Sequence, residues 1–293
     1  MAAPSPIVTG LPIPPDAPPH VTVITVVRNA RATLPATIES VLAQTHRPLE
    51  YLVLDGASTD GTLDLLRAYE GRLRFESAPD GGIYDAMNRA IARVERRDSY
   101  LFFLNADDRF VGPDAVARAV GGGEGADFVH CLLEWRDDAL RTREIVGGPV
   151  SLGRLRLQNR CGHQMIFCRR SVFDTAGGFD LRYPIAADYD WAIRVFQRPE
   201  ITKRFVPEVA ASMGAGGVSE RRYLRLLRER GRIVRERFGA QAAVEFALFA
   251  AAVEIPRLAI RRLLGAVGML RAARLVRRAV SGTPRSGAQS SSP

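Results

Sequence analysis

Short apolar runs alternate with polar turns and helical periodicity from residue 21 onward. Residues 21–27 are almost all β-branched, which predicts a strand buried on both faces. Apolar residues then recur at helical spacing over residues 34–42, with Thr33 in the N-cap position, before a second apolar strand at residues 50–54. A turn follows, and the next helix opens at Thr62. This order of strand, helix, strand and helix predicts a parallel sheet flanked by helices.

The alternation continues and then becomes less regular. A glycine-rich break at residues 121–123 interrupts it, and the two apolar stretches that follow are expected to pair in antiparallel fashion. We therefore expect an α/β fold with a mostly parallel central sheet. The further strands are expected at residues 73–76, 100–104, 128–135, 141–146 and 162–168, and the further helices at residues 83–94, near 114–120 and at 188–196.

The composition is that of an ordinary globular protein, with 46% hydrophobic and 25% charged residues. It excludes a disordered, collagen-like or disulfide-scaffold chain. The three cysteines are odd in number and lack Cys-x-x-Cys spacing, so neither a disulfide framework nor a zinc site is expected. The formal charge of +9 is unevenly distributed, because residues 217–293 hold 16 basic and 5 acidic residues whereas residues 1–216 hold 25 and 27. The basic tail therefore needs an interpretation of its own.

These patterns divide the chain into four parts. Residues 1–20 are rich in proline and lack the features of a signal peptide, so we expect a disordered lead-in. Residues 21–216 are expected to form the main α/β domain. A basic helical extension is expected at residues 217–280, followed by a disordered tail at residues 281–293.

Two interpretations of the basic extension remain open. Its apolar run at residues 239–255 is 17 residues long and contains Glu245 and Glu254, whereas a transmembrane helix needs about 20 mostly apolar residues. We therefore expect peripheral attachment to an anionic membrane surface through amphipathic, arginine-rich helices. The alternative is that residues 220–255 pack on the main domain. Nucleic-acid binding is not expected, because the tail has no recognised motif and no interleaved stacking aromatic residues.

Acidic turns follow three strands, and ligands of open α/β sheets bind at the carboxyl ends of strands. The turns carry Asp55, then Asp80 with Asp85, and then the adjacent pair Asp107 and Asp108. No Gly-x-Gly-x-x-Gly follows the first strand and no P-loop occurs, which disfavours a dinucleotide fold or a P-loop nucleotidase. Carboxylates can share a site with a diphosphate when a divalent cation lies between them. The pair at residues 107–108 is therefore the expected metal cradle, with a solvated turn as its alternative.

Several motifs at consistent spacing resemble the family-2 glycosyltransferases. They lie at residues 21–29, 40–45, 54–62 and 104–108, and together with the later segments they cover roughly residues 20–200. The segment at residues 80–88 is similar to the bacterial branch that builds O-antigen, colanic-acid-type and other surface polysaccharides. The resemblance implies a GT-A catalytic domain at residues 21–216, a nucleotide-diphosphate sugar donor, Mn2+ or Mg2+ as cofactor, and inversion at the anomeric carbon.

The resemblance also implies roles for particular residues. Asp188, before a helix, matches the position of the catalytic base, and its alternative role is that of a helix N-cap. His163 and Gln164 are candidates for an acceptor or diphosphate contact, with a structural role as the alternative for His163. Asp85 and Asn88 have the alternative of being surface residues of one helix. By position, Thr25, Val27, Asp55, Asp80, Asp85, Asn88 and Asp107 would bind the nucleotide sugar, and Asp108, the likelier direct ligand, and Asp107 would hold the metal.

The expected activity is the transfer of one sugar to an acceptor hydroxyl in bacterial cell-surface polysaccharide synthesis. The chain lacks the Gln-x-x-Arg-Trp motif that accompanies processive synthases in the family, so a single addition is expected. A saccharide acceptor, either free or lipid-linked, and a position on the inner face of the cytoplasmic membrane fit this interpretation. The alternative is a catalytically silent relative that serves as a membrane scaffold, which the intact acidic residues disfavour.

Overall fold

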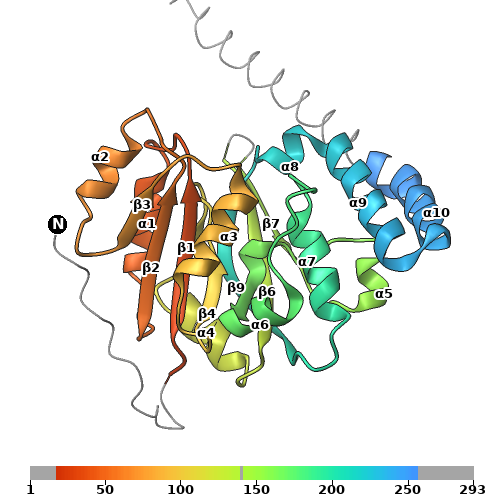
Figure 1. Cartoon of the computed structure of the whole chain (residues 1–293), viewed down its shortest axis with the longest axis horizontal. Coiled ribbons are helices and arrows are strands. Elements are labelled where there is room, and N and C mark those ends of the chain that lie inside the picture. Colours follow the sequence, from red (N-terminus) through yellow and green to blue (C-terminus); the bar gives the residue numbers. More distant parts are fainter. Residues whose placement is uncertain (1–17, 139–140, 257–293) are drawn as a thin grey trace, which may run out of the picture.

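The computed structural model describes residues 18–138 and 141–256. Its first half is a parallel sheet in the order β3-β2-β1-β4 (Figure 1). The chain contacts this sheet before Val21, the expected first residue of the domain. The Pro19 carbonyl accepts from the His46 side chain, and the His20 carbonyl accepts from the backbone N–H of Tyr100. The strands are β1 (Val21–Val27), β2 (Leu49–Asp55), β3 (Arg74–Ser77) and β4 (Tyr100–Phe103), and the helices are α1 (Leu34–Leu42), α2 (Thr62–Arg67), α3 (Ile83–Arg93) and α4 (Ala115–Gly122).

The second half of the sheet is mixed rather than parallel. β8 pairs antiparallel with β4 and with β6, whereas β6 and β9 run parallel to each other. The expectation of a mostly parallel sheet therefore holds only as far as β4, and the expected antiparallel pairing of β6 and β7 is confirmed. These strands are β5 (Arg109–Phe110), β6 (Phe128–Asp137), β7 (Thr142–Val146), β8 (Ile166–Arg169) and β9 (Lys203–Gly214).

Some expected elements need correction. The strand expected at residues 162–168 begins only at Ile166, because His163–Met165 form a 3-10 turn in front of it. The long strand β9 was not predicted, since it contains a proline and a register shift against β6 hides its alternation. Thr33 does occupy the N-cap position of α1, but its side chain makes no capping hydrogen bond. The helices α5 (Leu152–Leu155) and α6 (Arg170–Ala176) were also not predicted.

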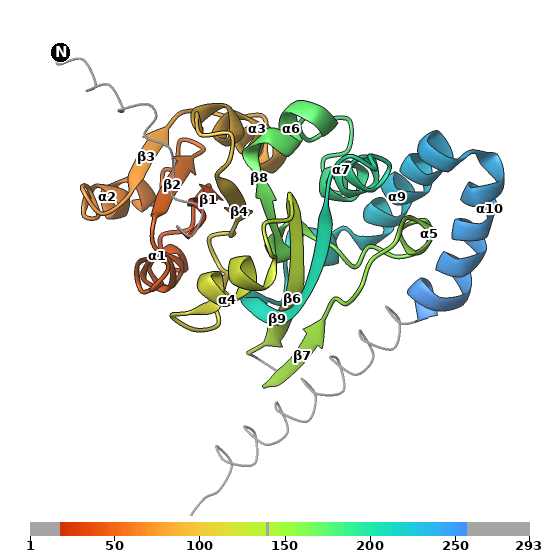
Figure 2. The same ribbon diagram turned by 90° about the horizontal axis from the view of Figure 1, so that it is seen from below.

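Helices cover both faces of the sheet. In the view from below, α3, α6 and α7 (Ala187–Phe196) lie on one face, and α1 and α4 lie on the other (Figure 2). An aromatic cluster fills the space beneath α7, where Phe173 stacks on Trp191 with ring centroids 4.6 Å apart. Phe179 contacts both rings, so the helix that carries Asp188 is fixed to a close-packed core.

The extension packs on the main domain as far as residue 256. It consists of α8 (Val218–Arg221), α9 (Tyr223–Phe238), α10 (Ala240–Phe249) and a π-helical turn (Ala250–Glu254). Ile233 and Val234 on α9 are fully buried, which agrees with the packed alternative for residues 220–255. No helix within the described residues is both long and apolar enough to cross a membrane. The expectations for residues 1–17 and 257–293 lie outside the described residues.

Candidate active site

The turn after β4 places Asp108 inside the protein. Asp108 is 1% exposed, its backbone N–H donates to the Asn105 carbonyl at 3.0 Å, and its own carbonyl accepts from the Thr37 hydroxyl on α1 at 2.7 Å. Asp107 is exposed, and its carbonyl accepts from the Arg136 guanidinium at 2.9 Å. Of these two adjacent acidic residues, one is therefore buried and the other is exposed.

The Asp108 carboxyl group is short of partners. Its Oδ2 atom accepts from the Gln164 side chain at 3.3 Å, whereas its buried Oδ1 atom has no hydrogen-bond partner. Burial raises the pKa of Asp108 to about 7, and the nearby charge of Asp107 adds to this rise. An unpaired carboxylate oxygen beside a second carboxylate is a position that a cation would satisfy.

Asp188 lies in the first turn of α7 and faces the same region. Its Oδ1 atom accepts from the Tyr189 backbone N–H at 2.8 Å, and its Oδ2 atom lies 3.1 Å from Nδ1 of His163. Burial acts to raise the pKa of Asp188, but hydrogen bonds and the charge interaction with His163, together with backbone donors, lower it below its usual value. Asp188 is therefore a buried carboxylate that stays ionised at neutral pH.

His163 and Gln164 connect the two acidic positions. His163 contacts Asp188 through Nδ1, and its Nε2 atom lies 3.4 Å from Oδ1 of Asn105. The next residue, Gln164, donates to Asp108. The predicted base and the predicted metal ligand thus contact neighbouring residues of the 3-10 turn, so four of the predicted site residues meet at the carboxyl end of β4.

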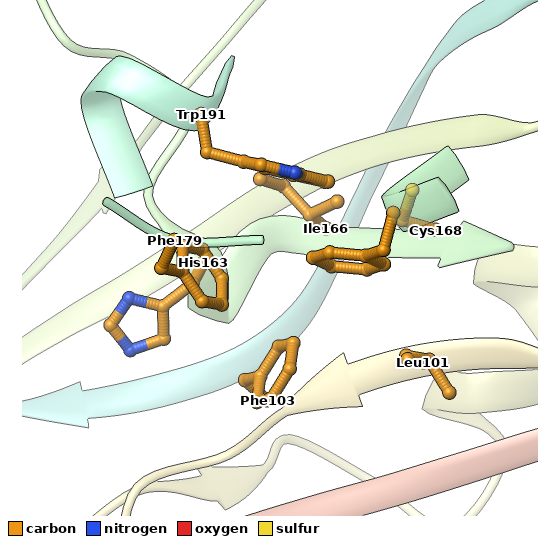
Figure 3. Close-up of a pocket in the computed structure, with 8 residues that line it drawn as sticks. Leu101, Phe103, His163, Ile166, Cys168, Phe179 and Trp191 are labelled. Atoms are coloured by element: carbon orange, nitrogen blue, oxygen red, sulfur yellow. The ribbon is translucent and has the colours of Figure 1, made fainter. Parts of the chain in front are cut away.

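An apolar wall lies directly behind His163. A cavity of about 10 Å³ is lined by His163 together with Phe103, Phe179, Trp191 and other apolar side chains. Figure 3 shows the imidazole at the edge of this cluster, with its ring pointing away from Cys168. A cavity of this size is too small for a nucleotide, because small-molecule sites measure roughly 300–1,000 Å³. The apolar side chains that line it lie against one side of His163.

Several residues predicted to line the nucleotide pocket have side chains that are buried inside the protein. The Thr25 side chain is fully buried, and its hydroxyl donates to the Leu104 carbonyl at 2.8 Å, so it does not line a pocket. Asp55 is 2% exposed and accepts from the Ser77 hydroxyl and from Ser58. Val27 pairs with Asp55 at the end of β1 and is also buried. These side chains shape the carboxyl edge of the sheet from within.

The predicted role of Asn88 in binding the nucleotide sugar needs correction. The Asn88 side chain holds the backbone of Phe179 on both sides, donating to its carbonyl and accepting from its N–H, each at 2.8 Å. It therefore fixes the loop before α7 instead of lining a donor pocket. Asp80 and Asp85 accept from the backbone N–H groups of Gly82 and Gly81, so both hold the turn that opens α3.

Asp80 and Asp55 belong to the same corner of the sheet. A Cβ atom placed on Gly56, the residue after Asp55, would lie 2.4 Å from Oδ2 of Asp80. A side chain at position 56 would therefore displace the Asp80 carboxylate. Asp80, which was predicted to bind the nucleotide sugar, therefore lies against the turn that follows β2.

The carboxyl groups of Asp107 and Asp108 fit a cation site with two carboxylate ligands. Within residues 18–138 and 141–256, no three or more His, Cys, Asp or Glu side chains gather as a metal-binding group. Mg2+ is usually held by one or two carboxylates together with phosphate oxygens of the substrate, so Asp107 and Asp108 suffice for this chemistry. The orphaned Oδ1 atom of Asp108 is the structural observation that supports this fit.

Sequence reasoning missed several residues that support the site. Arg136 on β6 binds both the Asp107 carbonyl and the Ser212 carbonyl, and Met213 contacts Gln164. They lie on strands that the fold brings beside the 107–108 turn, and no local motif marks them. Asn105 also lies at the site, with its Oδ1 atom 3.4 Å from Nε2 of His163.

Comparison with known proteins agrees with this fold. The family model of glycosyl transferase family 2 matches residues 22–129. A PGL/p-HBAD biosynthesis glycosyltransferase of Mycobacterium bovis (strain BCG / Pasteur 1173P2) is 36% identical over an alignment of 211 residues, and the alignment covers 69% of this chain and 80% of that protein.

Solved structures show the same fold at low sequence identity. S. aureus TarS 1-349 in complex with UDP-GlcNAc gives a TM-score of 0.57 at 16% identity, over 80% of this chain and 73% of that chain. Against a longer TarS chain the match spans only 44% of its length. The mannosyltransferase PcManGT from Pyrobaculum calidifontis, in complex with GDP-Man and Mn2+, gives a TM-score of 0.55 at 19% identity, over 90% of this chain and 86% of that chain. The chain therefore belongs to glycosyl transferase family 2 and is a glycosyltransferase of the GT-A fold.

Proposed function

We propose that the protein transfers one sugar from a nucleotide-diphosphate donor to an acceptor hydroxyl with inversion at the anomeric carbon. The observation that carries this proposal is the meeting of Asp188 and Asp108 on the adjacent residues His163 and Gln164. In this proposal Asp188 takes a proton, and the unpaired oxygen of Asp108 binds a cation. Inverting transfer needs a base at the acceptor hydroxyl, and a cation can stabilise the charge on the leaving diphosphate.

In the proposed reaction Asp188 is the general base. Its lowered pKa keeps it ionised, and the contact with His163 fixes the direction of its Oδ2 atom. The acceptor hydroxyl loses its proton to Asp188 as its oxygen attacks the anomeric carbon. The attack comes from the face opposite the diphosphate, so the configuration inverts and no covalent enzyme intermediate forms.

Asp107 and Asp108 would hold Mn2+ or Mg2+. When bound, such an ion supplies positive charge to the diphosphate that leaves. The unpaired Oδ1 atom of Asp108 supports this assignment, as does the Mn2+ complex of the similar mannosyltransferase. The carbonyl of Asp107 is held by Arg136, which fixes the turn without using either carboxyl group.

We also propose an acceptor in cell-surface glycan synthesis and a position at the inner face of the cytoplasmic membrane. The relative named for PGL/p-HBAD biosynthesis supports a surface glycan. On α10, Val244 and Leu248 are 60% and 67% exposed, and residues 257–280 carry seven arginines without an acidic residue. Exposed apolar side chains, followed in the sequence by an arginine-rich segment, favour an anionic lipid surface. A lipid-linked acceptor would lie at the same surface.

A donor screen tests the proposed activity. Purified protein is incubated with a panel of UDP- and GDP-sugars, including UDP-GlcNAc and GDP-mannose, and the released nucleoside diphosphate is measured with Mn2+, with Mg2+ and with EDTA. We expect release from one donor class that depends on a divalent ion. Binding of every nucleotide without release would favour a catalytically silent scaffold instead, and full release in EDTA would overturn the cation assignment.

A further inference from the structure

The helix α9 reaches the segment that leads into Asp188. The Glu229 Oε2 atom accepts from the backbone N–H of Ile185 at 2.9 Å and from that of Ala186 at 3.1 Å. Ala186 is the N-cap of α7, and Asp188 follows two residues later. A side chain from the C-terminal extension thus binds the main chain directly ahead of the proposed base.

The N-terminus of α7 lacks a capping side chain at its own N-cap position. The first N–H groups of a helix have no acceptor within the helix and are usually capped by a side chain. Ala186 has no side chain that could do so, and α7 has no capping hydrogen bond from its N-cap residue. The carboxylate of Glu229, from another element, accepts from the N–H of this N-cap residue and from that of Ile185 before it, so it binds the main chain directly ahead of the first helical residue, Ala187.

The same segment is held from other sides as well. The Tyr84 hydroxyl on α3 donates to the Ile185 carbonyl at 3.0 Å, so this peptide unit is bound on both of its polar groups. Farther along α9, Arg237 donates to the fully buried carboxylate of Asp190 at 2.8 Å. The Tyr183 hydroxyl donates to Glu236 at 2.6 Å, so α9 contacts the segment before and after Asp188.

α9 also contacts the chain that leads to His163. Arg230 is 5% exposed, donates to the Leu157 carbonyl at 3.0 Å, and lies over the Tyr189 ring at 5.0 Å. One helix therefore contacts both chain segments whose side chains form the Asp188–His163 pair. The relative position of the two segments depends on it.

Glu229 itself is separated from the reacting groups. Its side chain is 11% exposed, and its Oε1 atom pairs with Arg225 at 3.1 Å on the outer side of the helix. Its Oε2 atom meets only the two main-chain N–H groups among the hydrogen bonds of the described chain. Its hydrogen bonds lead toward Asp188 only through the main chain ahead of α7.

We propose that Glu229 is a positioning residue for sugar transfer, which sets the Asp188 carboxylate by accepting the two main-chain hydrogen bonds ahead of α7. This inference rests on the proposed role of Asp188 as base. It gives the C-terminal extension a part in the reaction that is separate from any contact with a membrane.

The test compares Glu229→Ala with Glu229→Gln, because the glutamine carbonyl oxygen can still accept both hydrogen bonds. Nucleoside diphosphate release from UDP-GlcNAc and GDP-mannose is measured with Mn2+. We expect Glu229→Ala to lower kcat about tenfold or more, with the donor KM unchanged within about twofold, and Glu229→Gln to stay within about twofold of wild type. The matched control is Arg225→Gln, which removes the outer ion pair and leaves both main-chain bonds, so it should keep wild-type kcat.

Two further measurements keep the outcome decisive. If Glu229→Ala does not fold, Glu229→Asp, whose shorter side chain cannot reach both N–H groups, replaces it with the same expectation. Hydrogen exchange at the Ile185 and Ala186 amides, which needs no substrate, should be faster in Glu229→Ala than in Glu229→Gln.

Wild-type kcat in Glu229→Ala, equal losses in both variants, or unchanged exchange would overturn the inference. Asp188→Asn, assayed alongside, separates the two proposals, because full turnover in that variant would overturn the role of Asp188 itself.

Discussion

The Asp108 carboxyl group is buried and its Oδ1 atom has no hydrogen-bond partner, so its protonation makes the stability of the protein depend on pH. Its pKa of about 7 lies above the value of 3.8 expected for an unfolded chain, so the folded protein binds this proton more tightly. The stability that protonated Asp108 contributes is therefore fully present below the unfolded pKa and is lost as the pH rises toward about 7. The slope in this window is at most about 1.4 kcal/mol per pH unit.

Asp108→Asn should remove this pH dependence. In EDTA, we expect the melting temperature of the variant to rise relative to wild type between about pH 5 and about pH 8, because the variant buries no charge. Thermal unfolding followed by circular dichroism measures this difference. Asp64→Asn, at a side chain that is 78% exposed, serves as control and should shift the melting temperature little. A constant offset between Asp108→Asn and wild type over this range would contradict the assignment.

At the scale of elements, Asn88 joins α3 to the loop before α7. Its side chain makes two hydrogen bonds with the Phe179 backbone, and Phe179 packs on Trp191 of α7. We expect Asn88→Ala to lower the free energy of unfolding by about 1–3 kcal/mol, because two main-chain groups lose their partners. Urea denaturation measures this loss. Arg89→Ala, one residue along on the same helix, should cost less than about 1 kcal/mol, and equal losses would contradict this role of Asn88.

Elements with strong periodicity could be predicted, and those defined by tertiary contacts could not. β1 and β2 were identified because both are apolar runs in the interior of a parallel sheet. β9 pairs with β6 through a register shift, and its mixed burial pattern gave no local signal. In the same way, the sequence placed Asp55 at a strand end but could not show that Ser58 and Ser77 already bind its carboxylate.

At the scale of the whole molecule, the site depends on convergence over long sequence distances. His163 meets Asp188 across 25 positions and Asn105 across 58. The motif resemblance pointed to each of the acids, but the contact of His163 with Asp188 and of Gln164 with Asp108 follows only from the folded chain. The supporting contact from Glu229 has no local signal at all, because it joins α9 to α7.

The exposed side chains of α10 make the membrane proposal testable. Replacing Val244 and Leu248 with serine removes apolar area from a surface-exposed face, so the fold should be kept while binding to anionic vesicles weakens by about tenfold or more. Co-sedimentation with phosphatidylglycerol vesicles measures the change. Leu181→Ser, at an exposed position of the main domain, is the control, and unchanged sedimentation of the double variant would argue against contact through α10.

The central claim is that the Asp188 carboxylate accepts the proton of the attacking hydroxyl. The most direct measurement is nucleoside diphosphate release by Asp188→Asn at saturating donor and Mn2+, together with the nucleotide dissociation constant of the same protein. We expect kcat to fall by a factor of about 10²–10⁴ while nucleotide affinity stays within about twofold of wild type. Turnover at the wild-type rate, or loss of turnover only in parallel with loss of nucleotide binding, would contradict the claim.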